Sequence, residues 1–313
     1  MNRVETARPE LSIVIPVFNE AATLMDLYQR LTRTLKDLGR PWEVIFVDDG
    51  STDRSAELLR ALHVQDPAVR VVRFNRNYGQ HAAVFAGMER ARGDVVITLD
   101  ADLQNPPEEI GALLRRLDDG FDVVGGARVS RRDPWFRRAA SRLVNRTTSA
   151  IVGVRMTDYG CMLRAYRRSV VDQIVACHEI SRFIPALANT FATAVAEVPV
   201  EHAPRREGRS RYGLLGLLRL NMDLMTGFSL LPIQAVSLAG VVVAALGLGF
   251  AVFLGLRRLL VGPEVEGVFT LFAILFFFVG LQILALGLIG EYVGRIYQEV
   301  RRRPRYVVAE FLA

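Results

Sequence analysis

Two acidic side chains one residue apart, Asp100 and Asp102, are the strongest candidates for catalytic chemistry in this sequence. They directly follow Val95–Leu99, an apolar run that predicts a buried strand. Carboxylate oxygens suit Mg²⁺ or Mn²⁺, and Gln104 adds a neutral oxygen. Such a metal takes its other ligands from water and substrate phosphates, and it stabilises the charge on a departing diphosphate. We predict Asp100 and Asp102 as catalytic residues, with Asp102 and Gln104 as metal ligands; the alternative is a turn that is merely rich in Asp.

A second acidic candidate, Asp49, stands just after another predicted strand, Glu43–Val47. A carboxylate at a strand end can accept the imide N–H of uracil, and the ring of Phe18 offers a surface on which a base can stack. In the alternative interpretation, Asp48–Ser51 is only a turn followed by a helix cap, and one of the two acids serves that turn alone. On the sequence both interpretations stay open.

Strands and helices alternate along the first part of the chain, which predicts an α/β fold: a parallel sheet with helices on both faces. Ligands of such sheets bind at the carboxyl ends of the strands, where Phe18, Asp49 and Asp102 fall. The predicted strands are Leu11–Val17, Glu43–Val47, Val69–Phe74 and Val95–Leu99. The predicted helices are Ala21–Leu38, a segment from Ser51 or Asp53 to His63, and Gln80–Arg92 closed by Gly93.

Two long segments near the end of the chain, Phe228–Leu256 and Val268–Gly290, contain no charged residue. Each is longer than the roughly 20 residues that a membrane-spanning helix needs, so we predict a two-helix transmembrane hairpin. Arginines precede the first segment and follow the second, which predicts that both termini and the catalytic domain lie in the cytoplasm. The predicted domains are a cytosolic domain (1–212), an interface helix (213–227), the membrane helices (228–290) and a cytosolic tail (291–313).

The charge of the chain is +6, which raises the question of a nucleic-acid partner. Lys36 is the only lysine, and the arginines concentrate beside the membrane segments, where anionic lipid is the available partner. We therefore predict membrane lipid, and no nucleic acid, as the partner of these charges. Two amphipathic segments, Trp135–Val152 and Leu214–Met225, are predicted helices that lie either in the membrane interface or on an ordinary surface.

Arginines between the catalytic domain and the bilayer are candidates for binding the phosphate of an acceptor. The guanidinium group binds phosphate through a planar pair of N–H donors. Taken singly, an arginine in so Arg-rich a chain is best interpreted as a solvated charge, and only the clustering favours a phosphate site. The candidates are Arg128, Arg131, Arg137, Arg205 and Arg211, the last two near Ser210 and Tyr212.

Several motifs together resemble the family 2 glycosyltransferases of the GT-A fold, and most of all their polyprenyl-phosphate branch. The resemblance covers nearly the whole chain, including the membrane segments. The residues that carry it are Ser12–Glu20, Val47–Ser51, Asn75–His81, Asp100–Gln104, Leu103–Glu109, Asp158–Tyr166, Cys177–Glu179, Phe183–Pro185 and Gly290–Tyr297.

This resemblance implies an inverting transfer of 4-deoxy-4-formamido-L-arabinose from its UDP-sugar to undecaprenyl phosphate at a bacterial inner membrane. The product feeds lipid A modification and polymyxin resistance. The resemblance also implies a Mg²⁺ or Mn²⁺ cofactor and a homotetramer. By position it assigns Pro16, Phe18, Glu20 and Asp49 to the nucleotide, and Asp102 and Gln104 to the metal. It assigns Arg128, Arg137, Ser141, Arg205, Ser210 and Arg211 to phosphates, and Arg128 joins Asp100 and Asp102 as a predicted catalytic residue. Arg211 stands where the family has Lys.

Three rival functions compete with this one. A sibling enzyme with another donor, such as UDP-glucose or GDP-mannose, would differ in the sugar pocket, for which Tyr159, Cys161 and Arg164 are candidates. A processive polysaccharide synthase would carry a Gln-x-x-Arg-Trp motif and more membrane helices, and this sequence has neither. A non-enzymatic membrane scaffold would have no reason to place acids after successive strands.

Overall fold

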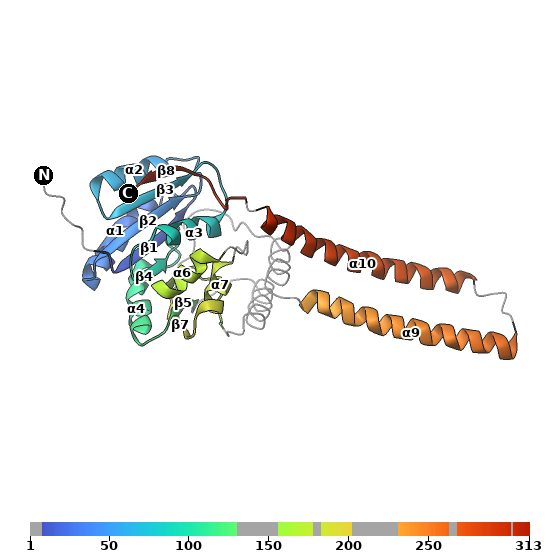
Figure 1. Ribbon diagram of the computed structural model, residues 1–313. Helices are drawn as coiled ribbons and strands as arrows, with labels where there is room; N and C mark the ends of the chain where they lie inside the picture. Colours follow the sequence, from blue (N-terminus) through green and yellow to red (C-terminus); the bar gives the residue numbers. More distant parts are fainter. Residues whose placement is uncertain (1–7, 130–155, 178–182, 202–230, 263–267, 302) are drawn as a thin grey trace. The chain divides into compact units, whose positions relative to one another are not determined.

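The computed structural model describes residues 8–129, 156–177, 183–201, 231–262, 268–301 and 303–313. The chain divides into two units (Figure 1). One unit comprises Met1–Leu217 together with Pro304–Ala313, and the other comprises Leu218–Arg303. Both ends of the chain therefore belong to the same unit.

An eight-stranded mixed sheet organises the first unit, in the order β7-β5-β6-β4-β1-β2-β3-β8. The four central strands, β4, β1, β2 and β3, are parallel to one another, as predicted. Strand β6 is antiparallel to β4 and β5, β7 is parallel to β5, and β8 is antiparallel to β3. The strands are β1 (Leu11–Val17), β2 (Trp42–Asp48), β3 (Val69–Phe74), β4 (Val95–Thr98), β5 (Val123–Arg128), β6 (Arg164–Arg167), β7 (Val195–Val200) and β8 (Val308–Leu312).

Helices cover both faces of the sheet, because the parallel strands need crossover helices. Helices α1, α2 and α4 pack with one set of strand side chains in the main apolar cluster. Helix α3 covers the other face, where a Cβ at its Gly87 would meet the side chain of Val14. The helices of this unit are α1 (Leu24–Leu38), α2 (Ser55–Gln65), α3 (Gln80–Arg90), η1 (Pro107–Glu109), α4 (Ile110–Asp118), α6 (Arg168–Ala176) and α7 (Ile184–Phe191).

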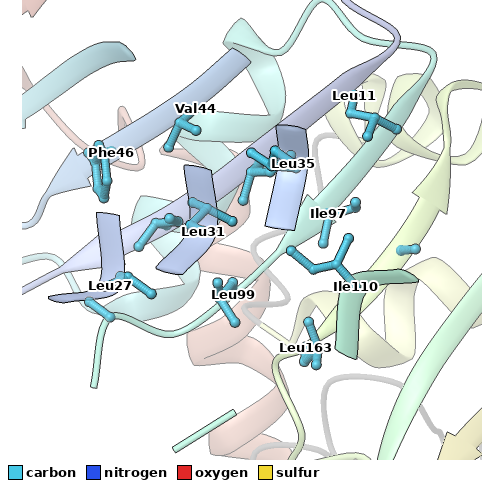
Figure 2. Close-up of a cluster of buried hydrophobic side chains, with 14 of the residues drawn as sticks. Leu11, Leu27, Leu31, Leu35, Val44, Phe46, Ile97, Leu99, Ile110 and Leu163 are labelled. Carbon is cyan, nitrogen blue, oxygen red and sulfur yellow. The ribbon is translucent and has the colours of Figure 1, made fainter. Parts of the chain in front are cut away.

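Helical periodicity explains why α1 docks where it does. Leu24, Leu27, Leu31 and Leu35 recur at intervals of three or four residues, lie on one face of the helix and are fully buried. Figure 2 shows three of these leucines beside Val44 and Ile97 of the sheet. Each buried leucine contributes about 1.5–3 kcal/mol relative to an exposed one, so this face anchors the loop that precedes the helix.

The starts of helices α1 and α2 differ from the prediction, because tertiary contacts replace local capping. Helix α1 begins at Leu24 rather than Ala21, since the N–H groups of Glu20 and Ala21 are bound by the side chains of Ser55 and Asp53. Helix α2 begins at Ser55 with Arg54 as its N-cap residue.

The predicted capping residue Asp53 still accepts a hydrogen bond, at 2.9 Å, from the N–H of the first helical residue, Ser55. Helix α3 ends at Arg90, and Gly93 does not close it. Gly93 instead lies against the backbone of β1, where a Cβ would come within 2.7 Å of the Ser12 nitrogen. The glycine therefore permits close packing rather than a helix end.

The last residues of the chain, which the sequence presents as a tail, form strand β8 at the edge of the sheet (Figure 1). Glu310 pairs with Arg60 of α2, with Nη2 to Oε2 at 2.7 Å. Phe311 lies under the guanidinium groups of Arg70 and Arg90. This strand belongs to the same sheet as the residues near the start of the chain.

Two long helices make up most of the second unit: α9 (Leu231–Val261, 31 residues) and α10 (Val268–Val300, 33 residues). Within the described residues, α10 contains one stretch long and apolar enough to cross a membrane, Phe277–Gly294; α9 contains a shorter apolar stretch, Ile233–Gly247. Both predicted segments are therefore helical where the structure describes them, and the two-helix transmembrane hairpin stays a prediction. The predicted helices Trp135–Val152 and Leu214–Met225 lie outside the described residues.

Candidate active site

Loops from all four central strands meet at the carboxyl edge of the sheet, because these strands are parallel neighbours. Hydrogen bonds join the loops directly. The hydroxyl of Thr23, after β1, donates to the Ala101 carbonyl, after β4, at 2.8 Å. The backbone N–H of Asn19 donates to the hydroxyl of Ser51, after β2, at 3.0 Å. The predicted nucleotide and metal residues thus stand on adjoining loops.

The loop after β1 carries three of the predicted nucleotide residues. Pro16 lies within the strand, opposite Val47, and Phe18 and Glu20 follow it, both partly exposed. Between them Asn19 adopts a left-handed backbone, with φ of 57°. Its side-chain oxygen accepts a hydrogen bond from the N–H of Thr52 at 2.8 Å. Asparagine tolerates this conformation better than most residues, so it can turn the chain sharply at the strand end.

The two acids after β2 have different surroundings. Asp48 is fully buried; its Oδ1 accepts the N–H of Ser51 at 2.9 Å, and its Oδ2 lies 3.2 Å from Nε of Arg73. Asp48 therefore serves the turn, as the alternative interpretation proposed for one of the pair. Asp49 accepts the N–H groups of Tyr78 and Gly79, at 2.6 and 2.9 Å, on its two oxygens.

Asp100 and Asp102 are partly exposed, and both are held in place. Asp100 accepts a hydrogen bond from the side-chain amide of Gln80, the first residue of α3. Asp102 Oδ1 accepts the N–H of Gln104 at 3.1 Å. Between these residues Leu103 has φ of 59°, an uncommon value for a branched apolar side chain. Backbone strain of this kind concentrates in loops that bind ligands.

The donor atoms at this edge fit a hard divalent cation that is completed by its substrate. Among the described residues no three His, Cys, Asp or Glu side chains cluster to form a metal site. Asp100 and Asp102 nevertheless offer carboxylates one residue apart at a partly exposed position. Mg²⁺ and Mn²⁺ commonly bind one or two carboxylates and take their remaining ligands from water and phosphate oxygens.

Arg128 stands at the end of β5 in a two-pronged pair with Asp158. Its Nε lies 2.6 Å from Oδ2 of Asp158 and its Nη2 lies 2.9 Å from Oδ1. Asp158 is buried, and its backbone N–H donates to Glu197. The predicted phosphate ligand therefore presents a guanidinium group whose orientation a carboxylate fixes.

The three candidates for the sugar pocket, Tyr159, Cys161 and Arg164, are buried. Arg164 donates to the carbonyls of Cys161 and Asp158, each at 2.9 Å, and so braces the 156–164 segment from within. Burial raises the pKa of the Cys161 thiol to about 11, which keeps it protonated at neutral pH. In this structure the three side chains support the site rather than line an open surface.

Several predicted residues lie outside the described part of the chain: Arg131, Arg137, Ser141, Arg205, Ser210, Arg211 and Tyr212. Sequence reasoning missed the contribution of Gln80 and of the Tyr78 and Gly79 backbone. The signal available for them was the motif Asn75–His81, in which a glycine immediately precedes a helix. His81, the last residue of that motif, packs edge-on against Phe183, with ring centroids 5.5 Å apart.

Two transferases are similar in sequence to this chain over nearly its whole length. The undecaprenyl-phosphate 4-deoxy-4-formamido-L-arabinose transferase of Edwardsiella ictaluri is 54% identical over 302 residues, which are 95% of this chain and 93% of that protein. The protein of that name from Aeromonas hydrophila is 52% identical and covers 96% of this chain and 94% of its own.

Among solved structures, Mycobacterium tuberculosis glucosyl-3-phosphoglycerate synthase, in complex with Mn²⁺, UDP and glucosyl-3-phosphoglycerate, shares the GT-A fold. Its TM-score is 0.51 at 19% identity, over 70% of this chain and 78% of that one. The sequence profile described as Glycosyl transferase family 2 matches residues 12–175, more than half of the chain. This chain, with its acids gathered at the carboxyl edge of a GT-A sheet, belongs to glycosyl transferase family 2.

Proposed function

We propose that this glycosyltransferase moves 4-deoxy-4-formamido-L-arabinose from its UDP-sugar to undecaprenyl phosphate, with inversion at the anomeric carbon. One observation carries the proposal: the similarity to transferases of that name extends over 95% of the chain and is not confined to the family 2 region. A sugar-nucleotide enzyme with a soluble acceptor would not need the second unit, with its long apolar helices.

The attacking group is the phosphate monoester of the lipid. Its second pKa is about 6, so at neutral pH it is mostly a dianion and needs no strong general base. The protein has instead to bring two anions together and stabilise the diphosphate that leaves. Asp49, with Phe18 and Glu20, holds the uridine in this proposal, and Arg128 faces the phosphates.

A divalent cation, Mg²⁺ or Mn²⁺, completes the donor site. Asp102 and Gln104 are its proposed ligands, with Asp100 beside them. A cation held there would supply positive charge to stabilise the departing diphosphate. The Gln80 amide and the Gln104 N–H keep the two carboxylates oriented toward this task.

The acceptor site is proposed from position along the chain. Arg137 and Ser141 fall within the predicted amphipathic segment Trp135–Val152. Arg205, Ser210 and Arg211 stand shortly before the second such segment, Leu214–Met225. The acceptor phosphate has to bind near the bilayer because its tail cannot leave the membrane. Losing one charge-assisted phosphate contact costs about 1.5–3 kcal/mol, so Arg137→Ala or Arg205→Ala raises the KM for undecaprenyl phosphate while that for the UDP-sugar stays unchanged.

Sheet pairing supports an even number of membrane crossings. Strand β8 pairs with β3, so the chain has to return after α10 to the side on which it began. A single crossing by α10 would separate these strands by a bilayer. With α10 long enough to span, α9 provides the second crossing, and both termini share the cytoplasm with the donor. The predicted cytosolic domain, 1–212, is then in water, and the predicted membrane helices, 228–290, are in the bilayer. The proposal includes a homo-oligomer, as the family resemblance implies.

Cysteine labelling tests this topology in a Cys177→Ser background. Val261, at the end of α9, is exposed. Val261→Cys should react with an impermeant maleimide in intact spheroplasts, whereas Ala313→Cys should react only after permeabilisation. The opposite labelling pattern overturns the orientation and the cytosolic donor.

Reconstitution tests the reaction itself. Purified protein in vesicles containing undecaprenyl phosphate is given radiolabelled UDP-4-deoxy-4-formamido-L-arabinose, UDP-glucose or GDP-mannose, each with Mg²⁺ or Mn²⁺. We expect lipid-linked label from the first donor alone, and none with EDTA. Label from one of the other donors makes the chain a sibling enzyme, and no transfer from any donor refutes the proposal.

A further inference from the structure

A single short turn contacts both halves of the candidate donor site. We call residues 75–80, between β3 and the first residue of α3, the 75–80 turn. Its backbone N–H groups at Tyr78 and Gly79 bind the carboxylate of Asp49. Its last side chain, Gln80, binds Asp100. Asp49, of the proposed nucleotide site, and Asp100, of the proposed metal site, are thus both hydrogen-bonded to the same six-residue turn.

The 75–80 turn also packs tightly against the loop that carries Asp49. A Cβ built on Gly50 would lie 2.4 Å from the carbonyl carbon of Arg76 and 2.8 Å from the nitrogen of Asn77. No ordinary Cβ tolerates such distances, so the two backbones touch directly. Gly79 adds a second constraint, because its φ of 98° and ψ of 154° are accessible almost only to glycine. A displacement of the turn therefore displaces Asp49.

Tyr306 and Val307, which precede the edge strand β8, contact the start of the 75–80 turn and the end of β3. The ring of Tyr306 stacks on Phe74, the last residue of β3, with centroids 4.7 Å apart and planes 17° apart. Phe74 in turn meets the ring of Tyr78 edge-on at 5.7 Å. The carbonyl of Val307 accepts the N–H of Asn75 at 3.2 Å.

The Tyr306 hydroxyl is bound as well, to Glu89 and Arg90 of α3. One aromatic residue therefore contacts the strand before the 75–80 turn and the helix after it. Stacked aromatic pairs contribute beyond their buried area and restrict side-chain motion. All of these contacts lie within the first unit.

We propose that Gln80 and Tyr306 are positioning residues of the donor site. Gln80 orients Asp100 for the cation, and Tyr306 fixes the 75–80 turn and through it Asp49. This inference rests on the proposed binding of a uridine diphosphate with a divalent cation; it does not depend on which sugar or lipid is used. Residues that follow the apolar helix α10 thereby become part of the nucleotide site.

Calorimetric binding of UDP to the purified full-length chain tests the proposal, with Mn²⁺ and separately with EDTA. The loss of one charge-assisted contact weakens binding about tenfold. Gln80→Ala should weaken UDP binding by about that factor with Mn²⁺ and leave it unchanged with EDTA. Tyr306→Ala should weaken it in both conditions, and Tyr306→Phe, which keeps the ring, should restore most of the affinity.

A matched control lies on the same C-terminal strand. Glu310→Gln breaks the pair with Arg60 at a distance from the turn, so it should lower the melting temperature without changing the affinity for UDP. If Glu310→Gln weakens UDP binding as much as Tyr306→Ala does, the effect is general instability and the inference fails. It also fails if Gln80→Ala binds UDP with Mn²⁺ as the wild type does.

The two proposals fail in different ways. Wild-type protein that binds UDP but transfers none of the three sugars refutes the proposed function and leaves the binding comparison decisive for Gln80 and Tyr306. Wild-type protein that binds no UDP overturns both.

Discussion

The amino and carboxyl ends of the parallel strands both carry acidic side chains, but the surroundings of these acids differ. At the amino end, Ser12, Glu43 and Arg70 are the second residues of β1, β2 and β3 and are all buried. Glu43 accepts hydrogen bonds from the Ser12 hydroxyl and the Arg92 N–H, each at 2.7 Å. Its other oxygen pairs with Arg70 and Arg92 at 3.0 and 2.9 Å.

At the carboxyl end, Asp48 pairs with Arg73, while the other acids accept hydrogen bonds from neutral groups. Asp49 binds two backbone N–H groups, Asp100 an amide side chain and Asp102 one N–H. Asp100 and Asp102 are partly exposed. Leu103, beside Asp102, and Asn19, on the neighbouring loop after β1, are the two non-glycine residues with positive φ among the described residues. In the proposed function, Asp100 and Asp102 stand beside the cation that comes with the substrate.

The difference shows what separates a structural charge from a functional one. A carboxylate whose oxygens are all engaged by cations and hydroxyls inside the protein stabilises the fold and offers nothing to a ligand. A carboxylate that accepts backbone or amide hydrogen bonds on a strained, partly exposed loop is oriented at a surface that a ligand can reach. Four predictions test this contrast.

The largest expected effect is on turnover at the carboxyl end. Asp102→Ala should reduce sugar transfer about 10³- to 10⁴-fold, because stabilisation of the departing diphosphate is lost. The thermal unfolding of the variant should match that of the wild type, since Asp102 is partly exposed. Transfer rates and melting temperatures of the same preparations check both statements, and near-normal transfer by the variant would contradict the metal site.

The next effect is on stability, at the amino end. Glu43→Ala leaves Arg70 buried without its carboxylate and should cost about 3–5 kcal/mol of unfolding free energy. The affinity of the folded fraction for UDP should be unchanged. Denaturant titration in detergent measures the first and calorimetry the second. A variant that unfolds normally but fails to bind UDP would reverse the assignment of the two ends.

A smaller loss is expected where the two turns of the donor site touch. Gly50→Ala meets both a left-handed φ of 71° and the Arg76 backbone, whereas Gly39→Ala meets only a φ of 66° in open space. The backbone conformation alone costs about 1 kcal/mol at either position. Gly50→Ala should therefore destabilise the protein more than Gly39→Ala, and only it should weaken UDP binding. Equal effects of the two variants would mean that the turns are not in contact.

The smallest effect is a pH dependence of stability from Glu43. Burial by itself raises the pKa of this carboxyl, but hydrogen bonds from Ser12 and the Arg92 N–H, with the charge of Arg70, outweigh it and lower the pKa. The resulting stabilisation is present above the ordinary value of about 4.3 and is lost as the pH falls through the lower, folded-state pKa. Unfolding titrations from pH 6 to 3 should fall less steeply for Glu43→Gln than for the wild type; parallel curves would contradict this.

Local sequence determined where the four parallel strands of the catalytic unit begin and end. Strands β1 to β4 fall within one or two residues of their predicted bounds, because runs rich in apolar residues end at or just before Asp or Asn. Their alternation with helices sufficed to predict a mostly parallel sheet and to place Phe18, Asp49 and Asp102 at one edge. Motifs and uncharged length likewise pointed to the family and to two long helices after residue 225.

Only the tertiary structure decided which neighbours those residues have. The order β4-β1-β2-β3 brings the start of α3 beside the end of β4, so Gln80 reaches Asp100, and no spacing along the chain encodes that contact. Strand β8 is short and half exposed, and its pairing with β3 joins segments more than 200 residues apart. Pairing energy of this kind comes from the partner strand rather than from the propensity of the segment itself. The sequence alone therefore shows which residues carry charge, while the folded sheet decides which neighbours each of those charges meets, because residues far apart along the chain come together only in the fold.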